Sequence, residues 1–458
     1  MSRSPEVTTL QDQLGGVVLV EGDEDYDRAR RVWNAMVDRR PRLIVRCTGP
    51  DDVVSAIRYA REHDLELGIR CGGHSIVGHA IPDDGLVVDL TPMNQVTVDP
   101  ARRRAWVEGG ALLGALDQAG EPHGLATTAG NVSHTGVGGL TLGGGMGWLA
   151  RQHGLTCDNV LSFEVVTADG RIVRASETEH PDLYWGLRGG GGNFGVVTTF
   201  EFQLHPIVDP TVQALLTFPL DRAADAFRGW RELALTAPRQ ATPTAWLGDV
   251  DGVPQVVLGF VWVGPLTGYD ELLASLRSIG RPLAEQVRRS SYLELQQQDD
   301  YDLEAPAQRR YWKGQYCTEL PDDAIAAFLG RGTADGTGAG LPYASFQVYG
   351  GAIADVPDEA TAFSQRDTFV EFVAAARWTD PAEDEERIAA ARRYGAAMAP
   401  FASGVYVNAL TDEGAAGVQQ AYGSAKLVRL QALKDTWDPD NVFHLNHNIA
   451  PTSAAAVS

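Results

Sequence analysis

A dense run of glycine limits the folding of this chain more than any other feature of its sequence. Eight of the eighteen residues from 130 to 147 are glycine. Because glycine has no Cβ, successive backbone N–H groups in such a run can point the same way and form a concavity that holds an anion. Glycine also lets two backbones approach closely, so a tightly packed turn between a sheet and a helix is the alternative interpretation. Either structure is favoured over general flexibility.

The charge of the chain restricts its partners. It has 38 basic and 60 acidic residues, a formal net charge of −22, which repels nucleic-acid phosphates and anionic lipid surfaces. A protein this acidic would need backbone N–H groups to hold a phosphorylated cofactor. The first residues form no apolar leader, and no run approaches the ~20 apolar residues of a membrane helix, so we expect a soluble, cytoplasmic protein.

The length of the chain and a change in its pattern of helices, strands and glycines predict two domains. The first two hundred residues mix helices with strands, including a helix expected over 25–38 and a hairpin of 161–167 with 171–175. Past Pro206 and Pro210 the glycine clusters end, and alternating strands with helices between them follow. The chain is therefore predicted to be α+β.

The short motifs outside the glycine run exclude several kinds of site. Gly190, Gly192 and Gly195 form a GxGxxG pattern. A dinucleotide-binding fingerprint needs a helix after these glycines, but residues 196–204 are predicted to form a strand. The spacing of the cysteines predicts neither a zinc site nor a disulfide framework; the cysteines are Cys47, Cys71, Cys157 and Cys317.

His74 is the other candidate for chemistry. It follows a predicted strand over 65–70, in Gly72-Gly73-His74-Ser75, where a glycine bend would project its side chain from the sheet end. A hydrogen-bonded polar residue without function is an equal alternative. Its spacing from His79 would allow chelation, as would that of His444 from His447. Neither pair lies on a clear helix beside a carboxylate, so no metal site is predicted.

Several motifs together resemble the berberine bridge enzyme-like oxidases, which have the vanillyl-alcohol oxidase (PCMH-type) FAD-binding fold. They occur in family order along nearly the whole chain, at 70–75, 130–147, 154–159, 182–185, 188–197, 437–443 and 446–451. The resemblance implies a PCMH-type FAD-binding domain over 1–207 and a substrate domain over 208–405, with a large antiparallel sheet covered by helices. Residues 406–458 would return to complete the first domain.

The resemblance also implies how FAD is held. His74 would be the covalent anchor on the flavin 8α-methyl. Ser133 stands where some members carry a second, cysteine attachment, so a single bond is expected, and Cys157 is interpreted as a small buried residue. Segments 70–75 and 130–147 would cradle the pyrophosphate and the flavin edge, 189–197 would approach the adenosine half, and the C-terminal asparagines would meet the isoalloxazine. The implied cofactor residues are Arg70, Cys71, Gly72, Gly73, His74, Ser75, Gly130, Ser133, His134, Thr135, Gly136, Gly138, Gly139, Gly143, Gly144, Gly195, Val196, Val197, Asn446 and Asn448.

The catalytic residues implied by the resemblance are Tyr406, Asn408 and Thr135. Alternation along a strand would place Tyr406 and Asn408 on one face, towards the flavin, where Tyr406 would orient or deprotonate substrate. An ordinary core tyrosine is the alternative. Thr135 and Leu140 would flank the flavin near N5. The aromatic and basic stretch 309–316, if a strand, would turn alternate residues to the flavin, although ordinary sheet packing is the favoured interpretation.

The expected reaction is hydride transfer from an alcohol, sugar or secondary-metabolite intermediate to flavin N5, with O2 as acceptor and H2O2 as product. A flavin dehydrogenase with another acceptor and a flavin-binding protein without turnover are the alternatives. The sequence leaves the oligomeric state open.

Overall fold

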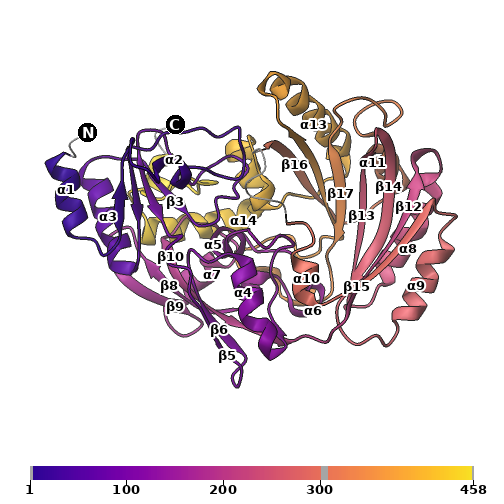
Figure 1. Cartoon of the computed structure of the whole chain (residues 1–458), viewed down its shortest axis with the longest axis horizontal. Helices are drawn as coiled ribbons and strands as arrows, with labels where there is room; N and C mark the ends of the chain where they lie inside the picture. Colours follow the sequence, from indigo (N-terminus) through magenta and orange to yellow (C-terminus); the bar gives the residue numbers. More distant parts are fainter. Residues whose placement is uncertain (1–3, 301–307, 456–458) are drawn as a thin grey trace.

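The computed structural model describes residues 4–300 and 308–455. Two lobes lie side by side, and the chain crosses to the second lobe and then returns to the first (Figure 1). The predicted α+β class is confirmed. No helix among the described residues is long and apolar enough to span a bilayer.

A four-stranded sheet near the N-terminus carries the His74 loop. Its order is β1-β2-β4-β3, in which β2, β4 and β3 run parallel. Helix α3 connects β2 to β3, and Pro50 with an acidic first turn favours its start. The elements are α1 (Pro5–Asp12), β1 (Val17–Leu19), α2 (Tyr26–Ala29), β2 (Leu43–Arg46), α3 (Pro50–Glu62), β3 (Leu67–Arg70) and β4 (Leu86–Asp89).

The predicted helix over 25–38 is wrong beyond its first turn. Helix α2 ends at Ala29, and the backbone N–H groups of Trp33 and Ala35 bond to Gly73 O and Gln308 O instead of to residues four positions earlier. Contacts with distant segments therefore override the helical pattern here.

A five-stranded antiparallel sheet completes the strands of the first lobe, in the order β5-β6-β10-β8-β9. The predicted hairpin of 161–167 with 171–175 is confirmed as β8 with β9, and β5 with β6 forms a second hairpin. The elements are β5 (Val96–Asp99), β6 (Arg104–Glu108), α4 (Leu113–Gly120), β7 (Leu125–Ala126), α5 (Val137–Leu142), α6 (Ala150–His153), β8 (Val160–Val166), β9 (Ile172–Ser176), α7 (Pro181–Leu187), β10 (Val196–Gln203) and β11 (His205–Pro206), of which β7 and β11 pair separately.

The second lobe is built on a seven-stranded antiparallel sheet in the order β15-β12-β14-β13-β17-β18-β16. Its strands are β12 (Thr211–Pro219), β13 (Ala241–Val250), β14 (Val253–Trp262), β15 (Ala284–Ser290), β16 (Arg309–Cys317), β17 (Tyr343–Val348) and β18 (Val370–Trp378). Its helices are α8 (Ala223–Thr236), α9 (Tyr269–Ser278), α10 (Tyr292–Gln296), α11 (Asp322–Gly330), α12 (Ala352–Asp355) and α13 (Asp384–Met398). The predicted large sheet covered by helices is confirmed.

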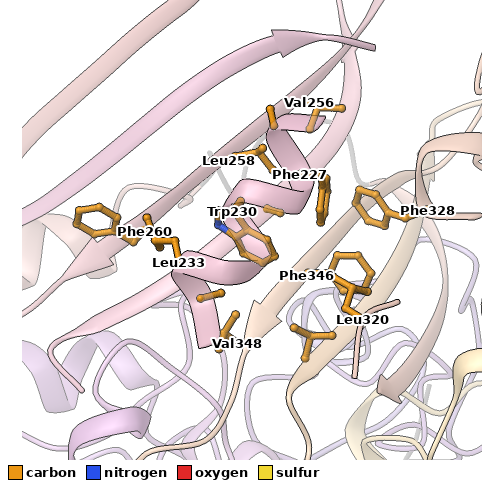
Figure 2. Close-up of a cluster of buried hydrophobic side chains, with 14 of the residues drawn as sticks. Phe227, Trp230, Leu233, Val256, Leu258, Phe260, Leu320, Phe328, Phe346 and Val348 are labelled. Atoms are coloured by element: carbon orange, nitrogen blue, oxygen red, sulfur yellow. The ribbon is translucent and has the colours of Figure 1, made fainter. Parts of the chain in front are cut away.

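The core of the second lobe lies between this sheet and the helices on one of its faces. Phe227 and Trp230 of α8 pack against alternate residues of the strands and against Phe328 of α11 (Figure 2). The helices bury this face, which leaves the opposite face of the sheet turned to the first lobe.

The C-terminal residues pack with the first lobe. Helix α14 (Gly414–Trp437) has a break at Gly423, where φ is +69°, and a short helix α15 (Thr452–Ala455) follows. Leu430, Leu433 and Trp437 share a hydrophobic cluster with Phe163 and Phe194 of the first two hundred residues. The chain thus closes its first lobe with its last residues.

Candidate cofactor site and active site

His74 lies where the two glycine motifs meet. The loop leaves the carboxyl end of β3 and bends at Gly73, where φ is +66°. His74 Nε2 is 2.6 Å from His134 Nδ1, and Thr135 Oγ1 is 3.4 Å from His74 Nδ1. Burial, with the nearby His134 and Arg310, lowers the pKa of His74 to about 3. Its imidazole is therefore neutral at physiological pH and keeps a nucleophilic nitrogen.

Trp33 fixes the orientation of His74. The two rings stack with centroids 4.8 Å apart and planes 17° apart, and the Arg310 guanidinium lies 3.9 Å from the Trp33 ring centroid. The Trp312 ring contacts the same indole edge-on at 5.3 Å. Asn34 is buried beside it, donates to Ile76 O and Arg310 O, and accepts from Arg310 N. Sequence reasoning missed these roles because a helix was expected over both residues.

Most glycines of the run allow close packing of neighbouring segments. A Cβ on Gly136 would overlap Gly72 and the Cys71 sulfur, and a Cβ on Gly72 would overlap the Gly136 backbone. Gly143 leaves room for the Asn408 amide. The remaining predicted positions Gly130, Gly138, Gly144 and Gly195 also lie against neighbouring atoms, whereas Gly139 faces open space, with nothing within 4 Å of an added Cβ.

Unpartnered polar groups test whether the site fits a phosphorylated cofactor. The four consecutive backbone N–H groups from Gly73 to Ile76 donate to no acceptor in the described ranges. Asn446 Oδ1 and Asn448 Oδ1 are buried and have no hydrogen-bond partner there either. Consecutive free N–H groups suit an anion, and amide oxygens suit a ring N–H donor. The residues present therefore fit the pyrophosphate and flavin of FAD.

The C-terminal asparagines are held against the segment 189–197. Asn446 Nδ2 donates to Gly192 O at 3.4 Å, and Asn193 Oδ1 accepts from Ile449 N at 2.9 Å. Val196 and Val197 are buried in hydrophobic clusters, so a cofactor contact there would come from the backbone. The structure thus brings 189–197 and 446–448 together.

Other predicted cofactor residues have partners of their own. Arg70 Nη1 lies 3.2 Å from a carboxylate oxygen of the buried Asp89. Ser133 N donates to Asp300 at 3.1 Å. Burial raises the pKa of the Cys71 thiol and of the Cys157 thiol, and Cys157 is fully buried, which agrees with its interpretation as a small core residue.

Tyr406 and Asn408 meet, but not on a strand. Gly404 makes one isolated bridge to Tyr316, and the backbone then turns into a 3-10 helix over Val407–Ala409. The predicted strand alternation is therefore wrong. The turn still brings the side chains together, because Asn408 Nδ2 donates to the Tyr406 hydroxyl at 2.9 Å.

The glycine run holds the Tyr406 hydroxyl. Gly145 N donates to it at 2.9 Å, and Asn408 also donates to Leu140 O at 3.3 Å. Burial raises the pKa of Tyr406, and the Gly145 and Asn408 donors oppose that shift. Of the two residues predicted to flank the flavin near N5, Thr135 lies beside His74, whereas Leu140 O lies at the Tyr406 end.

The stretch 309–316 is a strand, as one interpretation predicted. Residues of β16 alternate between α13 and the first lobe: Lys313 packs on Gly395, whereas Trp312 contacts Trp33 and Tyr316 stacks on Tyr406. The register of β16, β18 and β17 places Tyr316, Glu371 and Gln347 side by side on the same face. This face contacts the glycine run through Gln347 and Asn131, so the two together are the candidate lining of a substrate site.

A buried carboxyl lies behind Tyr406. Tyr349 donates to Glu371 Oε2 at 2.8 Å, and the hydroxyls of Tyr316 and Tyr349 are 3.4 Å apart. Glu371 is 8% exposed, and burial raises its pKa to about 7 against the opposing effect of the Tyr349 hydrogen bond. Sequence reasoning missed Glu371 and Tyr349.

The histidine pairs do not form a metal centre. His74 contacts His134, whereas the ring of His79 lies edge-on to His447 with centroids 4.9 Å apart. Within the described ranges, no group of three or more His, Cys, Asp or Glu side chains is arranged to hold a metal ion.

The chain matches two sequence families. Residues 41–176 match the FAD binding domain family, and residues 405–450 match the berberine and berberine-like family. The FAD-linked oxidoreductase YgaK of Bacillus subtilis is 30% identical over 96% of this chain and 98% of its own length. (R)-6-hydroxynicotine oxidase of Paenarthrobacter nicotinovorans is 29% identical over 96% and 97% of the two chains.

A solved structure shows the same fold over the whole chain. The crystal structure of 6-hydroxy-D-nicotine oxidase from Arthrobacter nicotinovorans superposes with a TM-score of 0.86 at 28% identity, covering 98% of this chain and 99% of that one. The His74 loop and the glycine run lie within the FAD-binding match, and Tyr406, Asn446 and Asn448 lie within the berberine-like match. The chain therefore belongs to the berberine bridge enzyme-like family of FAD-linked oxidoreductases, with the PCMH-type FAD-binding fold.

Proposed function

We propose that the protein is an oxidase that carries FAD covalently on His74 alone, oxidises a small organic substrate and passes the electrons to O2 with release of H2O2. The observation that carries the proposal is the neutral His74 imidazole at the meeting point of the two glycine motifs, 2.6 Å from His134. Ser133 offers a hydroxyl and no thiol, which supports a single attachment.

Different residues of the site would bind the cofactor and the substrate. The N–H groups from Gly73 to Ile76 would hold the pyrophosphate, and Asn446 and Asn448 would face the isoalloxazine. The bound flavin supplies the acceptor for the substrate's hydride. Tyr406, held by Gly145 and Asn408, would orient the substrate, and its phenolate form would take the substrate's hydroxyl or amine proton.

The substrate side favours a small molecule with polar groups on an apolar frame. Trp312 contributes an aromatic surface, and Gln347 reaches Asn131 of the glycine run, with 3.5 Å between Asn131 Nδ2 and Gln347 Oε1. The Trp312 indole N–H and the Gln347 amide N–H are buried without a partner in the described parts of the chain. Both donors would suit hydroxyl or carbonyl oxygens, as in an alcohol, a sugar or a secondary-metabolite intermediate. The relative named for 6-hydroxynicotine oxidation supports a small molecule.

The covalent bond is tested by acid precipitation of the purified protein. We expect yellow colour to stay in the pellet of the wild type and of His63→Ala, an exposed histidine outside the site, and to leave the pellet in His74→Ala. A colourless native protein contradicts the whole proposal. Free flavin released from the wild type contradicts only the covalent bond.

The electron acceptor is tested separately. The flavin is reduced anaerobically with a panel of alcohols and sugars, and air is then admitted while peroxide is measured. Peroxide equal to the reduced flavin supports the oxidase. Slow reoxidation without peroxide identifies a dehydrogenase that uses another acceptor.

A further inference from the structure

Strand β15 is a bare edge of the sheet in the second lobe. It is the outermost strand on the side opposite β16 and, among the described residues, it pairs with β12 alone. Residues 284–289 are all exposed, on both faces of the strand. An edge of this kind presents a row of unpaired backbone N–H and C=O groups, which can pair with a strand of another chain.

Two common protections of an edge strand are missing from β15. Its seven residues contain no proline, and its register with β12 runs from Ala284 to Ser290 without a bulge. Proteins use such devices because bare edges pair with other chains. Charged side chains are a further device, and β15 carries three of them. Their arrangement therefore decides what this edge can pair with.

The charges of β15 suit a second copy of the same strand. Two copies that pair antiparallel about a two-fold axis must be centred on a residue, because opposite side chains lie on the same face of the sheet. Centred on Val287, the pairing sets Glu285 of each copy opposite Arg289 of the other. Opposite charges in such cross-strand pairs stabilise a sheet. The other opposite pairs are Val287 with Val287, Gln286 with Arg288, and Ala284 with Ser290.

The neighbouring registers are less favourable. Centred on Arg288, the pairing would set two copies of this guanidinium directly opposite each other, which is destabilising. Centred on Gln286, it would set Glu285 opposite Val287, and no pair of opposite charges would form. The sequence of the strand therefore favours the register centred on Val287.

Glu285 and Arg289 are both available for these contacts. The register with β12 places them on the face that packs against helices, since their neighbours Leu216 and Val212 belong to that core. Arg277 of α9 contacts only Oε1 of Glu285, with its Nε at 2.9 Å, which leaves Oε2 for a second cation. Arg289 is exposed and forms no ion pair within the described ranges.

The local charge also lets a second copy approach. The chain has a formal net charge of −22, which repels copies of itself at long range. β15 differs from the rest of the chain, because it carries one acidic and two basic side chains. Val287 is 40% exposed, and pairing would remove this apolar side chain from water.

We propose that two copies of the protein associate through β15 into a symmetric dimer, in which their seven-stranded sheets join as one. The pairing is antiparallel and centred on Val287, with two Glu285–Arg289 pairs across the axis. Strand β16, which contacts the candidate active site, lies at the opposite edge of the sheet. The inference is therefore independent of the proposed function.

Sedimentation of the purified wild type measures the association. We expect its mass to rise from one chain to two between nanomolar and high micromolar concentration. Arg289→Glu and Glu285→Arg each place like charges opposite each other twice, so each should raise the dimer dissociation constant about tenfold or more. Arg102→Glu makes the same change of charge at an exposed arginine of the first lobe and should leave this constant unchanged.

A mixture of the two variants tests the register itself. In a mixed dimer of Arg289→Glu with Glu285→Arg, both cross-strand pairs again join opposite charges. Each variant should therefore bind the other about as tightly as wild type binds itself, although each dimerises weakly alone. Labelling one variant and titrating it with the other measures this affinity, and circular dichroism of each variant verifies its fold. The exposed Arg277–Glu285 pair contributes little to stability, so its loss does not prevent folding.

Hydrogen exchange locates the interface. Amides within 284–290 of the wild type should exchange more slowly at high than at low protein concentration. A wild type that stays a single chain at every concentration overturns the proposal. A dimer whose dissociation constant is the same in Arg289→Glu also overturns it, because that dimer uses another surface. Folded variants that do not bind each other overturn the pairing of Glu285 with Arg289. Neither flavin content nor turnover enters these measurements, so a failure of the proposed function would leave them intact.

Discussion

Lys434→Met removes the only cation from a fully buried ion pair that holds the C-terminal segment. Lys434 and Asp438 are both 0% exposed, with 2.7 Å between Lys434 Nζ and Asp438 Oδ2. Nζ also donates to Asn193 O and Phe443 O, each at 2.9 Å. These bonds tie α14 to Asn193 and to Phe443, which lies just before the two candidate flavin-facing asparagines.

The size of the effect follows from what the substitution leaves behind. Methionine fills the space of the lysine stem but leaves the Asp438 carboxylate buried without its cation, and two backbone carbonyls lose a donor. Removing one partner of a buried ion pair costs about 3–5 kcal/mol. The backbone N–H groups of Val442 and Phe443 still donate to Asp438, which places the expected loss near the lower end, about 3 kcal/mol.

Hydrogen exchange measures this loss locally. Because about 1.4 kcal/mol is a factor of ten, amides of residues 442–450 should exchange about a hundredfold faster in Lys434→Met than in wild type. The double variant Lys434→Met/Asp438→Asn removes both charges and should recover part of the protection. Arg239→Met removes an exposed pair with Asp355 and should change nothing measurable. Equal exchange in Lys434→Met and wild type would refute the view that this pair anchors the segment.

Two further predictions concern the site. Tyr406→Phe keeps the ring stacked on Tyr316 but removes the hydroxyl that Gly145 and Asn408 contact. Flavin reduction, measured by stopped flow, should therefore slow about a hundredfold at unchanged flavin content. An unchanged rate would exclude the hydroxyl from proton transfer. Gly136→Ala places a Cβ against Cys71 and Gly72 and should lower the midpoint temperature of thermal unfolding. Gly139→Ala, where a Cβ meets no neighbour, should leave this midpoint unchanged. Equal midpoints in the two variants would contradict the close approach of the two loops.

Features that depend on near neighbours in the chain were predictable. The hairpin of β8 and β9 follows from alternation on both sides of Asp169-Gly170, and β16 follows from its period of two. The position of His74 after a buried strand likewise follows from its own loop. Local patterns of this kind define the frame on which the site is built.

Features that depend on partners far away in the chain were not predictable from the sequence. Gly72 and Gly136 need each other for close packing, although 63 residues separate them in the chain, and a count of glycines cannot distinguish this from ligand binding. Tyr406 leaves the strand geometry because only one bridge holds it to β16. Glu371 reads as a polar residue in an apolar strand until Tyr349 is placed beside it. The helix expected around Trp33 is absent because Trp33 N bonds to Gly73 O and Ala35 N bonds to Gln308 O.

The buried Asn34 side chain has a mechanical consequence for how substrate enters. Its amide bonds at once to the loop after His74, through Ile76 O, and to the first residues of β16, through both backbone groups of Arg310. Swinging the lobes apart would break these bonds in a place that water does not reach, and each broken bond costs about 1–3 kcal/mol. We therefore expect the lobes to form one stiff frame. The size of molecule that reaches Tyr406 would then be fixed by side chains at the entrance and not by a hinge motion.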